Sequence, residues 1–253
     1  MTLTETARQR YSRFINLYDM GESAMESIIG TSVVVVGAGG LGSPALRLLA
    51  SLGFGKIRII DGDRVELTNL PRQHLYNAED VGKPKAQCAA KNLRRLNPEV
   101  EVETIEERLT DDNATDLIRG CNIIVDGLDS FQARRAVNRA SLKLRVPYVF
   151  AGAVEYFANL STFVPGKTAC FSCIMGGAQD RPEYTAAVRG VDPCLLSMAA
   201  GIEVREAVLL ATKGKSLLQG KLLTLDTSTM SLETFTIRPN EHCPSCGSSD
   251  TEE

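Results

Sequence analysis

The sequence lacks the features that several large classes of protein need. Its 253 residues carry 28 basic and 31 acidic side chains, a net charge of -3, so the basic excess typical of surfaces that bind nucleic acid or anionic lipid is missing. Its apolar runs, such as residues 33–36, are far shorter than the roughly 20 residues of a membrane-spanning helix. Charged residues interrupt the first 21 positions, where a secretory signal would be apolar. We therefore expect a soluble, cytoplasmic protein that binds neither nucleic acid nor membrane.

Histidine is also scarce, since only His74 and His242 occur. A catalytic triad or a Cys-His pair needs a histidine beside a nucleophile, and two isolated residues give no such arrangement. His74 is expected to pack within a polar loop, and His242 to be a neighbour of Cys243 rather than a metal ligand. The sequence therefore does not support hydrolysis by acid–base catalysis.

Short apolar strands alternate with helical segments through the first 150 residues. Strands are predicted at residues 31–36, 56–60, 100–105, 122–125 and 147–151, helices at 44–52, 84–96, 111–119 and 131–144, and a long loop at 62–82. This alternation is typical of right-handed crossovers and of a parallel sheet with helices on both faces. The predicted fold class is α/β, a doubly wound Rossmann-like sheet.

The pattern changes after residue 151. A strand is predicted at residues 159–164, a loop-rich segment at 165–192, an apolar helix at 195–212 and a hairpin at 221–226 and 231–238. These strands are expected to extend the mostly parallel sheet in antiparallel fashion. Residues 248–253 have the composition of a disordered tail.

A glycine-rich turn follows the first predicted strand. Gly37, Gly39 and Gly42 fit the pattern G-x-G-x-x-G between a strand and a helix, and Asp61 lies 19 residues further on, at the end of the second strand. Glycines let the backbone approach a phosphate, the helix N-terminus favours negative charge, and an aspartate can hold ribose hydroxyls. Taken alone, the pattern fits an NAD enzyme, or a tight turn without any ligand.

The polar residues that follow change this interpretation. Asp63, Asn69, Arg72 and Lys85 come within 25 residues of Asp61. Phosphoryl or nucleotidyl transfer needs cations beside the phosphates, because negative charge on the transferred group must be stabilised, whereas hydride transfer does not. Either cation alone could be a solvated surface charge. Together, after a glycine turn, they favour a nucleotide-transfer site.

An ordered set of motifs resembles a known family. Residues 37–43, 61–73, 82–86 and 126–129, preceded by Arg10-Tyr11-Ser12-Arg13, are similar to the motifs of ubiquitin-activating-type adenylyltransferases of the MoeB/ThiF/HesA group. The resemblance extends from about Arg10 to Cys246. Each motif alone is common, but their order and spacing are specific.

The resemblance implies a role for each matching position. Asp61 would hold the ribose of ATP, Arg72 and Lys85 with Asn69 would bind its phosphates, and Asp129 would hold Mg²⁺. Arg13 would reach across a dimer interface to the outgoing phosphates, so that Arg13, Arg72, Lys85 and Asp129 would be catalytic. The implied nucleotide-binding set is Gly37, Gly39, Gly40, Gly42, Asp61, Asp63, Thr68, Asn69, Arg72, Gln73, Lys85, Asp129 and Ser130.

The resemblance also implies a reaction and its partners. The protein would use MgATP to adenylate the C-terminal Gly-Gly carboxylate of a ubiquitin-like sulfur-carrier protein, with release of pyrophosphate. It would be a homodimer, with residues 1–30 as a helical dimer contact, 31–151 as the nucleotide-binding core and 152–247 as the carrier-binding part. Adenylation of a small molecule or a tRNA, an NAD(P)-dependent oxidoreductase and an inactive nucleotide-binding scaffold are the alternatives.

Four of the seven cysteines form two pairs, Cys170-Phe-Ser-Cys173 and Cys243-Pro-Ser-Cys246. Four thiolates are the usual ligands of structural Zn²⁺, and a site of four protein ligands leaves no open position for catalysis. The 69 residues between the pairs exceed the spacing of a compact zinc ribbon, so a redox dithiol is the competing reading. The prediction is a zinc staple that ties the C-terminus to the loop-rich segment.

The remaining cysteines have no partner in the sequence. Cys88 and Cys121 fall in apolar patterns and are expected to be small core residues. Cys194 precedes a predicted helix, where a thiolate would be favoured, but core packing is the expectation. Members of the family that carry an acyl group on sulfur have their cysteine at a position that matches the neighbourhood of Ala186. This chain has Tyr-Thr-Ala-Ala at residues 184–187, so the resemblance does not extend to a covalent step on sulfur.

Overall fold

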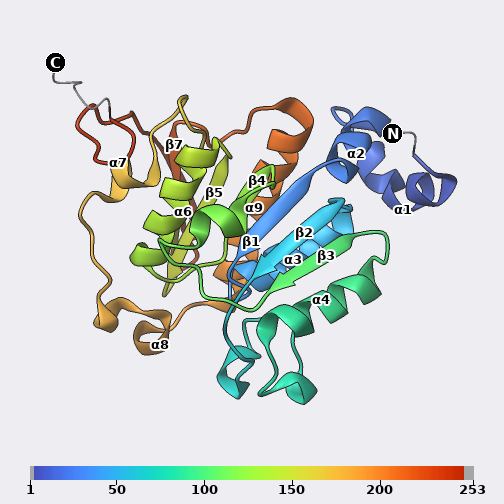
Figure 1. The fold of residues 1–253 in the computed structure, drawn as a ribbon, viewed down its shortest axis with the longest axis horizontal. Coiled ribbons are helices and arrows are strands. Elements are labelled where there is room, and N and C mark those ends of the chain that lie inside the picture. The colour runs from blue at the N-terminus through green and yellow to red at the C-terminus, as the bar shows by residue number, and fades with distance from the viewer. Residues whose placement is uncertain (1–2, 248–253) are drawn as a thin grey trace.

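The computed structural model describes residues 3–247, which form one eight-stranded sheet. The strand order is β3-β2-β1-β4-β5-β6-β7-β8, parallel through β5 and antiparallel from β5 to β8 (Figure 1). The strands are β1 (Ser32–Val36), β2 (Lys56–Ile60), β3 (Glu101–Ile105), β4 (Ile123–Asp126), β5 (Tyr148–Val154), β6 (Phe157–Phe163), β7 (Lys221–Asp226) and β8 (Ser231–Thr236). The predicted fold class is confirmed, including the antiparallel extension.

Helices cover both faces of the sheet, as the continuous apolar strands require. The main ones are α3 (Gly42–Leu52), α4 (Lys85–Leu96), α5 (Ala114–Ile118), α6 (Phe131–Leu144) and α9 (Pro193–Lys213). Val33 and Val35 of β1 are buried with α3, α4 and α9, whereas Val34 and Val36 are buried with α5 and α6. The two-residue period of the strand therefore divides its side chains between two cores.

The N-terminal helices lie at one end of the sheet. These are α1 (Glu5–Ile15) and α2 (Gly21–Ile29), and α2 leads directly into the amino end of β1 (Figure 1). The Tyr11 hydroxyl accepts a hydrogen bond from Asn97, which follows the last turn of α4, and Tyr11 also lies against Gly53, which follows α3. Because α3 and α4 end here, α1 lies at the edge opposite to the carboxyl ends of the strands.

Several predicted boundaries differ from the structure. The predicted helix at 111–119 is only the short α5, because the side chain of Asn113 accepts the Thr110 N–H at 2.7 Å and closes a turn before the helix. The predicted loops contain α7 (Phe171–Met175), α8 (Ala186–Arg189) and the 3-10 turns Leu67–Asn69, Ala78–Asp80 and Pro182–Tyr184. The predicted tail, 248–253, lies outside the described residues. Between residues 3 and 247, no helix combines the length and the apolar character that crossing a membrane would require.

Candidate nucleotide site and cysteine cluster

A cavity of about 600 Å³ opens at the carboxyl ends of β1, β2 and β4. The strand order reverses its direction between β1 and β4, which is where open α/β sheets bind their ligands. Eleven of the predicted nucleotide positions line this cavity: Gly37, Gly39, Gly40, Asp61, Asp63, Asn69, Arg72, Gln73, Lys85, Asp129 and Ser130. The structure therefore brings together residues that are up to 93 positions apart in the sequence, from Gly37 to Ser130.

The glycine turn after β1 packs directly against the turn after β4. Gly37 has a φ of +91°, and a Cβ atom there would lie 2.4 Å from the carbonyl oxygen of Gly127. A Cβ atom on Gly42 would lie 1.9 Å from the Gly37 oxygen, and one on Gly127 would lie 2.1 Å from the same atom. Gly42 is therefore a packing residue behind the turn, and it does not line the cavity.

Asp61 organises the glycine turn in addition to facing the cavity. Its Oδ2 accepts the Ala38 N–H at 2.7 Å, and its Oδ1 accepts the Asp63 N–H at 2.8 Å. Burial raises the pKa of Asp61, and the two backbone donors partly oppose that shift. The sequence motif implied only ribose binding for Asp61 and did not predict that its carboxylate holds the glycine turn.

Asp63 lies between two cations. The Lys85 ammonium is 3.3 Å from its Oδ2, and Arg108 donates to its Oδ1 at 2.9 Å. Partial burial works to raise the pKa of Asp63, but Lys85 and then Arg108 outweigh it and leave the pKa lowered. The Lys85 side chain is only 9% exposed, so its ammonium is confined to the cavity wall.

The loop after β2 carries the other predicted phosphate ligands. Asn69 is buried and its Oδ1 accepts the Glu66 N–H at 3.1 Å, which fixes the 3-10 turn. Arg72 is half-buried on the cavity wall and donates to the Thr68 carbonyl at 2.7 Å. Gln73 is buried and its Oε1 has no partner among the described residues. The Thr68 side chain is exposed and does not line the cavity.

The turn after β4 positions Asp129 at the start of α6. Ser130 is the N-cap of α6 and accepts the Ala133 N–H at 3.2 Å, while the exposed carboxylate of Asp129 faces the cavity. Below the turn, Arg134 donates to Asp126 at 3.1 Å and to the carbonyl of Leu128. Arg134 therefore braces the turn that carries Asp129. The sequence pattern did not single it out.

A second buried acid lies beneath this turn. Glu203 of α9 is fully buried, and neither of its carboxylate oxygens has a partner among the described residues. Asp126, also fully buried, accepts hydrogen bonds from Arg134, Tyr148 and the Leu128 N–H. Burial, and then the charge of Asp126, raise the pKa of Glu203 well above its usual range. Of these two acids, Asp126 is the one that forms an ion pair with Arg134.

Arg13 lies away from the cavity. It is exposed in the last turn of α1, at the edge of the sheet opposite to the cavity. The helix α3 runs from one edge of the sheet to the other, and its length of roughly 16 Å gives the distance between the two edges.

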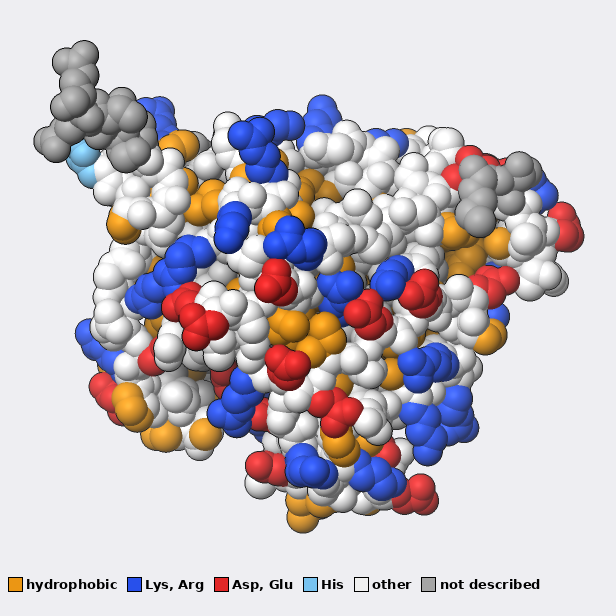
Figure 2. Space-filling view, in the orientation of Figure 1, with side chains coloured by type: hydrophobic (Ala, Val, Ile, Leu, Met, Phe, Trp, Pro, Cys, Tyr) orange, Lys and Arg blue, Asp and Glu red, His pale blue; other side chains and the backbone are white. Residues whose placement is uncertain are grey.

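Acidic and basic side chains are interspersed over the face shown in Figure 2, as the small net charge suggests.

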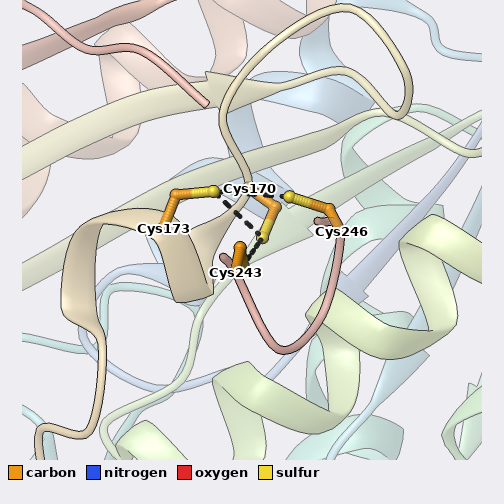
Figure 3. A group of neighbouring side chains, drawn as sticks. All are labelled: Cys170, Cys173, Cys243 and Cys246. Carbon is orange, nitrogen blue, oxygen red and sulfur yellow. Dashed lines mark hydrogen bonds between the residues drawn. The ribbon is translucent and has the colours of Figure 1, made fainter. Parts of the chain in front are cut away.

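The four paired cysteines converge, as Figure 3 shows, from α7 and from the C-terminal segment. The Sγ atoms of Cys170 and Cys173 are 3.8 Å apart, those of Cys170 and Cys243 are 3.6 Å apart, and those of Cys173 and Cys246 are 3.3 Å apart. A zinc ion with four sulfurs at 2.3 Å requires sulfur separations of about 3.8 Å. The cluster could therefore hold zinc with little adjustment.

The surroundings of the cluster act on its thiols in opposite directions, because burial raises the pKa of Cys170 and that of Cys246. The backbone N–H groups of Ser245 and Cys246 approach Cys243 and, against its burial, lower its pKa to about 7. The Asn240 N–H lies 3.4 Å from the sulfur of Cys173. His242 is exposed and outside the group of possible ligands, as predicted.

The other cysteines divide between core and surface. Cys88 and Cys121 are buried, as predicted. The expectation of core packing is wrong for Cys194, which is exposed, because Leu195 and Leu196 take the buried positions of this first turn of α9. Elsewhere, His74 is also exposed rather than packed in its loop.

The chain is similar to known proteins along nearly its whole length. The model of the ThiF family matches residues 11–245. The chain is 35% identical to the SAMP-activating enzyme E1 of Haloferax volcanii, over 98% of this chain and 92% of that protein. It is 36% identical to the sulfur carrier protein adenylyltransferase of Thermus thermophilus, over 100% of this chain and 95% of that protein. The structure of Escherichia coli MccB with ATP is similar with a TM-score of 0.83 and 25% identity, over 97% of this chain and 76% of that chain.

Proposed function

This chain belongs to the ThiF family, and from that premise we propose that it is an ATP-dependent adenylyltransferase acting on a ubiquitin-like sulfur-carrier protein. The substrate group is the carrier's C-terminal Gly-Gly carboxylate, and the products are an acyl-adenylate and pyrophosphate. One observation carries the proposal: the glycine turn, Asp61, Arg72, Lys85 and Asp129 face a single cavity.

The residues of the cavity suit an in-line attack on phosphorus. A carboxylate oxygen of the terminal glycine forms a bond to the α-phosphorus of ATP, and the bond from that phosphorus to the pyrophosphate oxygen breaks. A carboxylate is already ionised at pH 7, so no general base is needed. This agrees with a cavity whose wall contains no histidine among the described residues. Catalysis then consists of positioning and charge stabilisation by Arg72 and Lys85.

Two metal ions fit the residues present. Asp129 offers an exposed carboxylate oxygen on the cavity wall, the type of ligand that Mg²⁺ prefers, and would hold it there. Bound Mg²⁺ supplies positive charge to the phosphates. The cysteine cluster fits Zn²⁺ with no open position, so its role is structural.

The direct test is the mass of the carrier after reaction. Incubation with MgATP and a candidate Gly-Gly carrier should add the mass of AMP to the carrier's C-terminal glycine, as mass spectrometry would detect. A carrier lacking its last glycine is the control and should remain unmodified. An enzyme stabilised against heating by NAD but not by MgATP would instead be an oxidoreductase. ATP binding without adenylate on any carrier tested would indicate a scaffold.

The remaining features of the proposal concern assembly. The N-terminal segment 1–30 forms the homodimer contact, 31–151 forms the nucleotide core, and 152–247 binds the carrier, with Tyr184, Thr185 and Ala186 of that part lining the cavity. The protein acts in the cytoplasm. Arg13 lies at the opposite edge of the sheet and does not line the cavity of its own chain, so in this proposal it serves the site of a second copy.

Mixed dimers test the role of Arg13. Each of the variants Arg13→Ala and Asp129→Ala is expected to be inactive alone, because each lacks one part of every site. In a mixed dimer, one site receives an intact Arg13 and an intact Asp129, so up to about half of the wild-type activity per active dimer should return. Verified mixed dimers without any recovered pyrophosphate exchange would contradict action in trans.

A further inference from the structure

The loop after β3 brings a cation to the cavity that the sequence motifs did not predict. Residues 107–111 line the cavity wall, and the Arg108 side chain is 82% exposed. The loop can approach because Gly62 has no side chain: a Cβ atom there would lie 2.9 Å from the Arg108 nitrogen. Arg108 is thereby placed over the Asp61–Asp63 turn.

Asp63 would hinder the binding of a triphosphate if it stood alone. Its carboxylate is on the cavity wall, and its negative charge would repel phosphate and attract the Lys85 ammonium. The structure gives each carboxylate oxygen its own cation, Lys85 at 3.3 Å from Oδ2 and Arg108 at 2.9 Å from Oδ1. Lys85 is thus shared between Asp63 and whatever anion enters the cavity.

We propose that Arg108 is a positioning residue, which neutralises Asp63 so that Lys85 is free to bind the phosphates of the nucleotide. The inference rests on the proposed function, because it assigns a triphosphate to this cavity. Without Arg108, Lys85 is the one cation that still pairs with Asp63 among residues 3–247, and the entering nucleotide must compete with Asp63 for Lys85. Arg108 itself need not touch the nucleotide. Its contribution lies in nucleotide affinity rather than in the chemical step.

The test measures ATP binding by calorimetry without carrier, together with KM for ATP and kcat in carrier-dependent pyrophosphate exchange. Arg108→Gln should raise the dissociation constant and KM by about five- to tenfold and leave kcat within about twofold. Arg108→Lys should restore part of the affinity. In an Asp63→Asn background, Arg108→Gln should have less than about a twofold effect, because the charge that Arg108 neutralises is absent. Arg119→Gln removes a comparable exposed ion pair, with Asp116 at 3.0 Å, away from the cavity and should change nothing.

Three outcomes would overturn the inference: unchanged affinity in Arg108→Gln, an equal loss in the Asp63→Asn background, or a loss in kcat alone. The first outcome would show that the exposed ion pair between Arg108 and Asp63 contributes nothing measurable to ATP affinity, as is true of many exposed ion pairs. Wild-type protein that binds ATP but adenylates no carrier would defeat the proposed function and leave the binding test of Arg108 intact. Wild-type protein that binds no ATP would overturn both.

Discussion

Replacing Arg72, Lys85 or Asp129 with alanine is expected to lower carrier-dependent pyrophosphate exchange by at least about a hundredfold in each case. These side chains line the same cavity, and removing one stabilising group from a charge-developing transition state costs about 10²–10³ in rate. The loss is expected most clearly for Lys85. Its ammonium is nearly buried, so no mobile cation of the protein surface can take its place when the side chain is removed. The measurement is isotope exchange between pyrophosphate and ATP, with and without the carrier.

Lys83→Ala provides a matched control for Lys85→Ala. Lys83 lies two residues away, has a side chain that is 56% exposed and does not line the cavity. Its replacement should leave exchange within about twofold of the wild type. Near-normal exchange in all three cavity variants, with melting temperatures unchanged, would refute the assignment of this cavity as the adenylation site.

Removing one ligand of the cysteine cluster is expected to destabilise the whole protein. The protein should contain one zinc per chain, and Cys246→Ser should lose it. Because the ligands come from α7 and from the C-terminal segment, loss of the metal also releases the tie between them. We expect a loss of about 3 kcal/mol or more, which corresponds to roughly 6–12 °C in melting temperature for a chain of this size.

Cys194→Ser is the control for this variant, because Cys194 is exposed and outside the cluster. It should retain zinc and melt with the wild type. The redox alternative predicts a different result: no bound metal in protein purified without chelator, and two disulfides on mild oxidation. That result would contradict the prediction of a zinc site.

The fold could be predicted largely because its signals are local. The predicted bounds of β2 and α6 coincide with Lys56–Ile60 and Phe131–Leu144, where a short β-branched run and a Ser130 cap mark the ends. The predicted helix bounds were wrong where a side chain competed with the helix for backbone partners, as Asn113 does before α5. The prediction of core packing for Cys194 was wrong because an apolar pattern does not specify which residue of a helix's first turn faces the solvent.

The residues of the cavity wall that belong to sequence motifs could be predicted, whereas the others could not. Arg108 was missed because its partner Asp63 is 45 positions away, and no periodicity links a β3 loop to the end of β2. Glu203 was missed for a similar reason: α9 reads as an ordinary apolar helix, and only the packed structure puts this acid beneath the turn after β4. The catalytic and binding roles of the motif residues stay predictions until the variants are measured.

The contact among Gly37, Gly42 and Gly127 has a mechanical consequence. The two turns meet through main-chain atoms alone, so no side chain between them can rotate to absorb a relative shift. A shift of the first turn would therefore also shift the second, which carries Asp129 two residues after Gly127. The position of this carboxylate on the cavity wall is thus tied to that of the glycine turn, and a single added methyl group at any of the three positions would force the turns apart.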